Sequence, residues 1–172
     1  LHIHTALSAD AFSTGTRTLP DDAYRYARGS NLDAVILNPG PTLKYLTGLN
    51  FHLMERPVVL FIAPGKDPVL VLPELELPKV DLFPYTVQGI AYGENPLEWD
   101  DAFRKASQAL GVDGKRIGVE PRQLRLLEFR HVKSGAPEAD FPDASDVLAD
   151  LRLCKDKAEV DAMCVAVKIA QD

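Results

Sequence analysis

The sequence predicts an α/β fold: a three-layer domain in which helices cover both faces of a mixed, mostly buried β-sheet that contains a central antiparallel hairpin. The hairpin is predicted because the segments PVVLFIA and PVLVLP flank the turn sequence PGKD. Both segments are nearly continuous apolar runs, so other elements should cover both faces of the hairpin. Strand-like and helix-like segments alternate on either side of it, which is the pattern of a layered α/β domain.

Three elements are expected before the hairpin. Residues 18–29, TLPDDAYRYARG, begin with Thr18 as a helix N-cap and end with a terminating glycine, which predicts a short helix. Residues 32–38, LDAVILN, are rich in branched side chains and predict a strand that the turn NPGP closes. Residues 42–48, TLKYLTG, predict one or two helical turns that end at the glycine.

The clearest helix after the hairpin covers residues 95–111, NPLEWDDAFRKASQALG. Asn95 is a suitable N-cap, Pro96 suits the first helical position, and Glu98 stands where a capping box needs an acid. A glycine ends the segment. Its apolar residues recur at helical spacing and should form one buried stripe: Trp99, Phe103, Ala106 and Leu110.

The rest of the domain is expected to add strands and a helix to this frame. Residues 86–92, TVQGIAY, and 115–121, KRIGVEP, each predict a strand. A helix is expected to run from Pro121 toward His131. Residues 139–144, ADFPDA, predict a weak last strand. These elements complete the three-layer arrangement.

The last segment predicts an amphipathic helix that does not finish within the chain. Asp156 is an N-cap and Glu159 can reach back to it, so the helix should begin at Lys157. Neither a glycine nor a proline ends it, and its last residue is the acid Asp172. We therefore expect the helix to continue past that residue. Its apolar residues share one face, and we interpret Cys164 as core filling: Val160, Met163, Cys164 and Val167.

Composition excludes several classes of function. The chain of 172 residues fits one domain, and its formal charge of −6 with dispersed Lys and Arg argues against nucleic-acid binding. No apolar run reaches the length of a transmembrane helix, so no membrane association is expected. The first residues, LHIHTALSAD, lack the pattern of a signal peptide, so we expect a cytoplasmic protein. Two cysteines do not make a disulfide framework.

Most motifs that carry chemistry are missing from the sequence. There is no GxGxxG, no phosphate loop and no GxSxG elbow. His2 and His4 share a strand face and could bind a metal, but no third ligand is near, so we interpret them as a frayed end. Glu74 and Glu76 could be paired catalytic carboxylates. We interpret them instead as a solvated strand end or the start of a helix.

The densest group of reactive side chains lies in YLTGLNFHLMERP, between a helix and the buried hairpin. It contains Tyr45, Asn50, His52, Glu55 and Arg56. Loops that a rigid scaffold holds often carry binding groups. Arg56 can hold a carboxylate in a bidentate fork, and His52 can exchange a proton near neutral pH. The alternative is that His52 and Glu55 form a surface pair and Arg56 caps a helix end. Sequence alone leaves both readings open.

The order of four segments resembles a known family. LDAVILNPGPTLKYLTGLNF, RPVVLFIAPGKDPVLVLPELE, RIGVEP and DVLADLRLCKDKAEVDAM follow one another as in the N-terminal domain of the creatinase and Xaa-Pro peptidase family. That family, the M24 metallopeptidases, includes aminopeptidase P and prolidase. The segments YLTG and LRLCKDKAEVDAM carry most of the resemblance, which runs from about Pro20 to Asp172.

The resemblance implies a division of the chain into three parts. Residues 1–17 are expected to be a disordered or extraneous N-terminal segment, and residues 18–153 the creatinase-type N-terminal domain. Residues 154–172 would begin a junction helix that leads to a C-terminal metallopeptidase domain. In the family that second domain holds two divalent metal ions, Mn, Co or Zn. This chain is expected to contain no catalytic residue, no metal ligand and no cofactor of its own.

The resemblance also implies a function. The chain would be the non-catalytic N-terminal domain of an Xaa-Pro dipeptidase or aminopeptidase, inactive alone, with its own C-terminal catalytic domain as partner and a homodimer as assembly. In the family, the loop after YLTG reaches toward the active site of the neighbouring subunit. By position, this suggests a role in substrate access for Asn50, Phe51, His52 and Arg56.

Two alternatives remain open at this level. The parent could be a creatinase-like or ectoine-hydrolase-like enzyme, because relatives with those activities have the same N-terminal domain. The chain could instead belong to a non-catalytic relative, in which the domain serves only binding or assembly. The sequence of this segment does not separate these functions.

Overall fold

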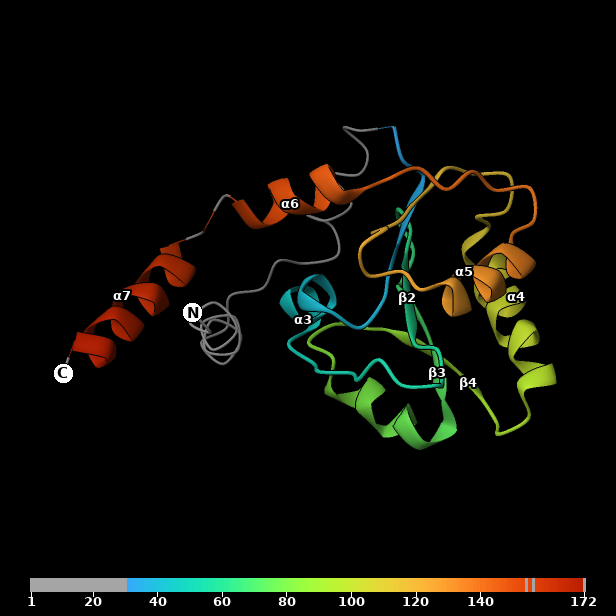
Figure 1. The fold of residues 1–172 in the computed structure, drawn as a ribbon, viewed down its shortest axis with the longest axis horizontal. Helices are drawn as coiled ribbons and strands as arrows, with labels where there is room; N and C mark the ends of the chain where they lie inside the picture. The colour runs from blue at the N-terminus through green and yellow to red at the C-terminus, as the bar shows by residue number, and fades with distance from the viewer. Residues whose placement is uncertain (1–30, 154, 156, 172) are drawn as a thin grey trace.

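A single five-stranded sheet forms the centre of the computed structural model, which describes residues 31–153, 155 and 157–171. The strand order across the sheet is β4-β3-β2-β1-β5, so β2 is the central strand. Figure 1 shows the fold, with β2, β3 and β4 labelled. The bounds of the strands are Ala34–Leu37 for β1, Val59–Ile62 for β2, Val69–Pro73 for β3, Gln88–Tyr92 for β4 and Ile117–Gly118 for β5.

The sheet is mixed, and its centre is the expected hairpin. β2 pairs antiparallel with β3, with Phe61 opposite Val69, and also antiparallel with β1. The outer strands are parallel to their neighbours, since β4 pairs with β3 and β5 with β1. Every residue of β1, β2 and β3 is buried. The continuous apolar runs therefore correspond to strands that are covered on both faces.

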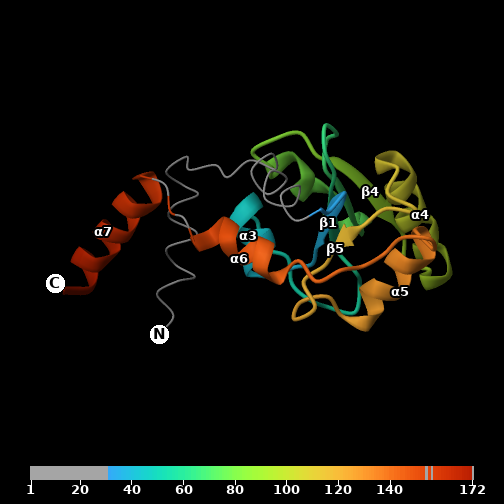
Figure 2. The ribbon, with the colours of Figure 1, turned by 90° about the horizontal axis from the view of Figure 1, so that it is seen from above.

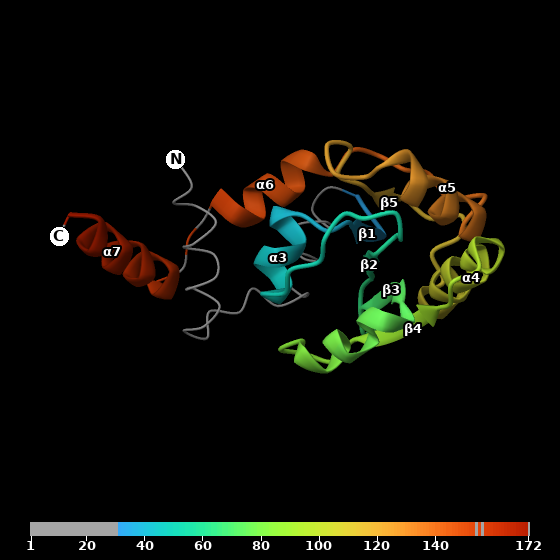
Figure 3. The same cartoon turned by 60° about the horizontal axis from the view of Figure 1, so that its bottom comes forward.

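Helices cover both faces of the sheet, which confirms the three-layer prediction. Helices α4 (Trp99–Leu110) and α5 (Leu126–Gly135) lie on one face, while α3 (Pro41–Thr47) and α6 (Ser145–Leu153) lie on the other (Figures 2 and 3). Two 3-10 helices join these elements: η1 (Glu74–Leu82) after β3 and η2 (Pro96–Glu98) before α4. Helix α7 (Lys157–Gln171) is the last helix in the described part of the chain.

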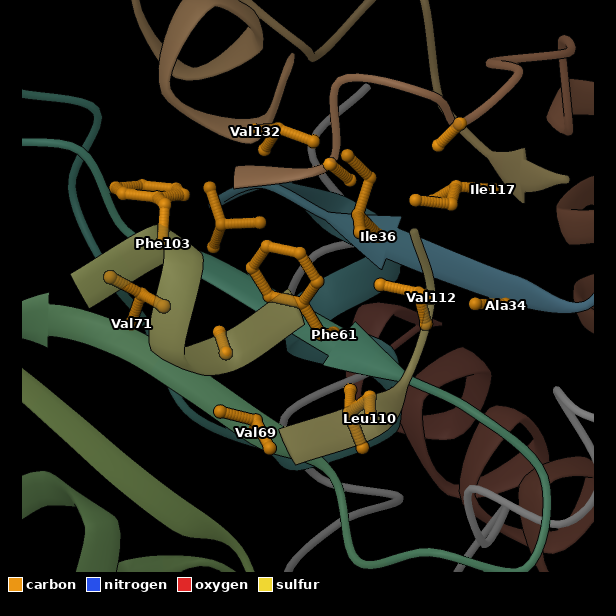
Figure 4. Close-up of a cluster of buried hydrophobic side chains, with 14 of the residues drawn as sticks. Ala34, Ile36, Phe61, Val69, Val71, Phe103, Leu110, Val112, Ile117 and Val132 are labelled. Carbon is orange, nitrogen blue, oxygen red and sulfur yellow. The ribbon is translucent and has the colours of Figure 1, made fainter. Parts of the chain in front are cut away.

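Alternation along the strands divides the buried side chains into two clusters. Ile36 and Phe61 point toward α4 and α5, whereas Leu37 and Leu60 point toward α3 and α6. In the first cluster the Phe61 and Phe103 rings meet edge to face with centroids 6.3 Å apart (Figure 4). The sheet is thus fixed by an independent apolar layer on each side, and its register cannot slip without exposing both layers.

Helix α4 follows the sequence prediction closely. The Asn95 side chain accepts a hydrogen bond from the backbone N–H of Leu97, and Gly111 ends the helix in the left-handed region at φ 60°. The first turn is the 3-10 helix η2, so the α-helix proper begins at Trp99. The four residues of the expected stripe are all buried: Trp99, Phe103, Ala106 and Leu110.

Two predicted boundaries differ from the structure. The helix expected from Pro121 toward His131 begins only at Leu126 and continues to Gly135. Residues before it form a turn in which the Glu120 carbonyl accepts from the N–H groups of Gln123 and Leu124, and the next residue is extended. The strand expected over residues 139–144 is reduced to two isolated bridges, because Pro142 has no N–H to continue a ladder.

Helix α7 extends away from the sheet and its covering helices (Figure 1). Its apolar side chains Val160, Met163 and Val167 are exposed. Cys164 is also exposed, so its interpretation as core filling is wrong for this chain. The helix expected over residues 18–29, the pair His2 and His4, and the residues Cys154, Asp156 and Asp172 lie outside the described residues.

Candidate functional site

The candidate site is the segment of residues 49–58, called the 49–58 loop, which joins α3 to the central strand β2. Its start is fixed by the end of α3. Gly48 takes the left-handed conformation at φ 71°, which a side chain would strain. The Thr47 hydroxyl donates to the Leu43 carbonyl and accepts from the Leu49 N–H at 3.0 Å. The loop therefore leaves the helix in one defined direction.

Phe51 and Lys79 fasten the first half of the loop to η1. Phe51 is only 5% exposed and belongs to the cluster beneath α3 and α6. The Lys79 ammonium lies 4.9 Å from the centre of the Phe51 ring and donates to the Asn50 carbonyl at 3.5 Å. It also forms an ion pair with Glu76, one 3-10 turn earlier. Lys79 thus joins two segments that the sheet alone would leave independent.

Arg56 and Tyr92 fix the second half of the loop against the end of β4. Arg56 donates through Nη2 to Glu94 Oε2 at 2.5 Å, and its Nε lies 3.9 Å from Glu55 Oε1. The Tyr92 hydroxyl donates to the Pro57 carbonyl at 2.7 Å. Burial raises the pKa of the Tyr92 phenol well above its ordinary value, so this donor stays protonated across the neutral range.

Between these two anchors the tip of the loop is open to solvent. His52, Leu53, Met54 and Glu55 are exposed. His52 forms no hydrogen bond or ion pair with any residue among 31–153, 155 and 157–171. The surface pair between His52 and Glu55, one of the readings left open by the sequence, is therefore not formed here. The imidazole is available for a group outside the described chain.

A cavity of about 270 Å³ lies beside this tip. Its lining combines apolar side chains with four that carry or can carry charge. The apolar group is Phe51, Met54, Val58, Pro73 and Leu75; the others are His52, Glu55, Arg56 and Glu76. Such a cavity can accept an apolar side chain while a guanidinium or imidazole binds a carboxylate beside it. The structure thus brings Phe51, His52 and Arg56 together, while Asn50 contributes its carbonyl to the Lys79 contact.

The paired acids after β3 have a structural position. Glu74 and Glu76 lie in the first turn of η1, and Glu76 is paired with Lys79. This confirms their interpretation as the start of a helix. No three or more His, Cys, Asp or Glu side chains in the described part of the chain are placed to hold a metal ion. The described residues thus do not fit a dinuclear metal centre.

Lys79→Met is expected to loosen the loop without unfolding the domain. The methionine keeps the apolar stem but loses the contact with the Phe51 ring and the bond to the Asn50 carbonyl. Because an exposed cation–π contact contributes about 0.5–1 kcal/mol, the free energy of unfolding should fall by about 1 kcal/mol or less. Amide hydrogen exchange at residues 50–54 should accelerate by about fivefold.

Lys66→Met is the matched control for this change. Lys66 also donates to a backbone carbonyl, that of Ala109 at 3.0 Å, but at the hairpin turn. Its replacement should leave exchange in the 49–58 loop unchanged. Equal acceleration in both variants, or none with Lys79→Met, would show that Lys79 does not anchor the loop.

The comparison with known families matches this architecture. The family model described as Creatinase/Prolidase N-terminal domain matches residues 22–154, which is most of the chain. The chain belongs to this family. Its mixed sheet, hairpin and covering helices are those of creatinase N-terminal domain structures. None of the helices in the described part of the chain has both the length and the apolar character needed to cross a membrane.

Three of the proteins to which the chain is similar are named as dipeptidases. The chain is 26% identical over 137 residues to the putative dipeptidase YkvY of Bacillus subtilis, covering 80% of this chain and 38% of that protein. A crystal structure of a proline dipeptidase from Streptococcus pneumoniae is 26% identical, with a TM-score of 0.66 over 81% of this chain and 100% of that one. A dipeptidase structure from Pyrococcus horikoshii is 26% identical, with a TM-score of 0.69 over 83% and 38%. The chain therefore spans little more than a third of the curated relative.

Proposed function

We propose that this chain is the non-catalytic N-terminal domain of an Xaa-Pro dipeptidase, and that its 49–58 loop shapes substrate access to the catalytic domain of the neighbouring subunit in a homodimer. One observation carries the proposal. The loop is anchored at both ends, through Lys79 and through Arg56 and Tyr92, yet it presents His52 without a partner among the described residues. A loop with anchored ends and an exposed tip is suited to contact another protein surface, here that of the neighbouring catalytic domain.

The parent reaction in this proposal is hydrolysis of the bond before proline in a dipeptide. Proline lacks the N–H and fixes φ, which sets such substrates apart from ordinary peptides. Two divalent metal ions in the catalytic domain would supply the activated water. The family membership and the dipeptidase names of similar proteins support this reading. The residues of this chain would contribute only by binding and orienting the substrate.

Within the loop we assign the residues separate parts. His52 would face the bound dipeptide or its entrance, and Arg56 would attract the free carboxylate of the terminal proline. Phe51 would form the apolar floor beneath them, because it is buried beside the cavity. Asn50 would set the path of the backbone through its bond from Lys79. Together these four residues would form one rigid edge of the cavity.

Arg56→Ala in the full-length protein is expected to raise KM for an Xaa-Pro dipeptide by about tenfold, with kcat within about twofold. The size follows from the loss of one charge-assisted hydrogen bond. The free energy of unfolding should change by less than about 1 kcal/mol, because the ion pairs that Arg56 forms with the described residues Glu55 and Glu94 are exposed. Steady-state kinetics over a range of dipeptide concentrations measures both parameters.

Arg104→Ala is the matched control, since Arg104 forms a comparable exposed ion pair with Asp101 on α4. It should leave KM unchanged. If the two variants behave alike, Arg56 has no part in the site. If the full-length protein fails to hydrolyse any Xaa-Pro dipeptide in the presence of Mn²⁺, Co²⁺ or Zn²⁺, the proposed activity is wrong.

A further inference from the structure

The charges around Arg56 indicate an additional residue that acts on the same site. Arg56 lines the cavity, and 27% of its side chain is exposed. Its Nη2 nevertheless donates to Glu94 Oε2 at 2.5 Å, while Glu55 lies on its Nε side. A carboxylate that enters the cavity therefore meets a guanidinium that already has a carboxylate partner.

Glu94 differs from Arg56 in where it lies. It follows β4 in the chain, 38 residues after Arg56, and it is not among the residues that line the cavity. Its side chain is 74% exposed and forms no other ion pair with the described residues. Glu94 can thus move away into solvent while Arg56 stays beside the cavity. The ion pair is exposed, so separating it costs little.

We propose that Glu94 is a specificity-determining residue that competes with the free carboxylate of the substrate for the Arg56 guanidinium. The inference rests on the proposed function, because it needs Arg56 to meet that carboxylate. In the unbound protein Glu94 holds the guanidinium at the rim of the cavity. On binding, the substrate carboxylate takes the place of Glu94, and Glu94 becomes solvated.

The competition has a chemical consequence for substrate choice. Only a ligand with a negative charge gains from displacing Glu94, because a neutral amide cannot replace an ion pair. The Glu94 carboxylate therefore weakens the binding of a ligand that needs the Arg56 guanidinium, whereas an uncharged ligand leaves the Arg56–Glu94 ion pair in place. Free dipeptide acids are selected over dipeptide amides. Removing the charge of Glu94 should strengthen the binding of a free dipeptide acid, because the Arg56–Glu94 ion pair then no longer has to be separated.

The test is a cycle of variants in the full-length protein, with an Xaa-Pro dipeptide as the probe. Glu94→Gln keeps the size of the side chain but removes its charge, and we expect KM for the free acid to fall about two- to fivefold, the range of one exposed ion pair. In the Arg56→Ala background the same change should have no effect. Asp101→Asn, which breaks the exposed ion pair with Arg104, is the control and should leave KM unchanged.

The possible outcomes separate the inference from the proposed function. If Arg56→Ala raises KM but Glu94→Gln leaves it unchanged or raises it, the competition is wrong while the role of Arg56 stands. An equal fall in KM with and without Arg56 would show a general charge effect and would also overturn the inference. If Arg56→Ala itself leaves KM unchanged, or the protein hydrolyses no such dipeptide, the proposed function fails and the inference fails with it.

Discussion

Arg125→Met is expected to lower the free energy of unfolding of this domain by about 3 kcal/mol. Glu128 in the first turn of α5 is completely buried, and Arg125 is its partner in a side-on fork, with Nε 3.0 Å from both carboxylate oxygens. The hydrogen bonds that the guanidinium donates to Glu128 raise the pKa of Arg125, which keeps its positive charge. Removing Arg125 leaves a buried carboxylate without its counter-charge, which costs about 3–5 kcal/mol. The lower figure applies because Arg125 is partly exposed.

A second replacement distinguishes the loss of the partner from the loss of packing. In the variant with both Arg125→Met and Glu128→Met, neither charge remains, and stability should return to within about 1–2 kcal/mol of the original. Urea denaturation of the three proteins measures the differences. If the double variant is as unstable as the single one, the ion pair does not hold the start of α5.

Phe103→Ala is expected to destabilise the domain by about 3–5 kcal/mol, the usual cost of removing a buried phenylalanine. Phe103 is fully buried on α4, where its ring packs edge to face on Phe61 and stacks on His131 at a centroid distance of 5.3 Å. The closely packed surroundings should relax only partly into the space. A Cβ added at Gly135 would already lie 2.8 Å from the Phe103 carbonyl oxygen, which shows how closely α5 and α4 approach.

Two comparisons complete this prediction. Phe103→Leu should cost about 1–2 kcal/mol, because most of the buried volume is retained. Leu97→Ala should change stability by less than about 0.5 kcal/mol, since Leu97 is 90% exposed in the turn just before α4. Thermal or urea unfolding measures all three. Similar losses for Phe103→Ala and Leu97→Ala would contradict the assignment of this core.

The parts of the fold that were predicted from the sequence are those with local causes. The hairpin follows from two apolar runs around one turn, and α4 follows from a capping asparagine, a periodic stripe and a terminating glycine. The start of α5 was missed because the extended conformation of Arg125 follows a turn at Glu120 that has no strong sequence signal. Helix propensity alone does not locate such a boundary.

The partners of the loop could not be predicted for a different reason. The sequence indicated Arg56 and His52 because the first can bind a carboxylate, the second can exchange a proton, and both lie in one short loop. Lys79 and Glu94 are 29 and 38 residues away from the atoms that they contact, on segments with no motif of their own. Only the pairing of β4 beside β3 brings Glu94 to Arg56. Long-range polar contacts of this kind depend on the topology rather than on any local pattern.

The apolar stripe of α7 is exposed in the described structure. Val160, Met163 and Val167 are exposed, and none of them belongs to either buried cluster of the described residues. The division at residues 17 and 153 that the resemblance implied remains a prediction. Limited proteolysis of the full-length protein would locate these boundaries.

The central claim is that the 49–58 loop of one subunit serves the active site of its neighbour, and mixed dimers test it most directly. One subunit would carry Arg56→Ala, and the other an intact loop with a disabled metal site in its catalytic domain. If the loop acts across the dimer, the active catalytic domain receives an intact loop, and the mixed dimer should show the original KM at about half the original kcat. If the mixed dimer shows only the raised KM of Arg56→Ala, the loop serves the active site of its own subunit, and the claim is contradicted.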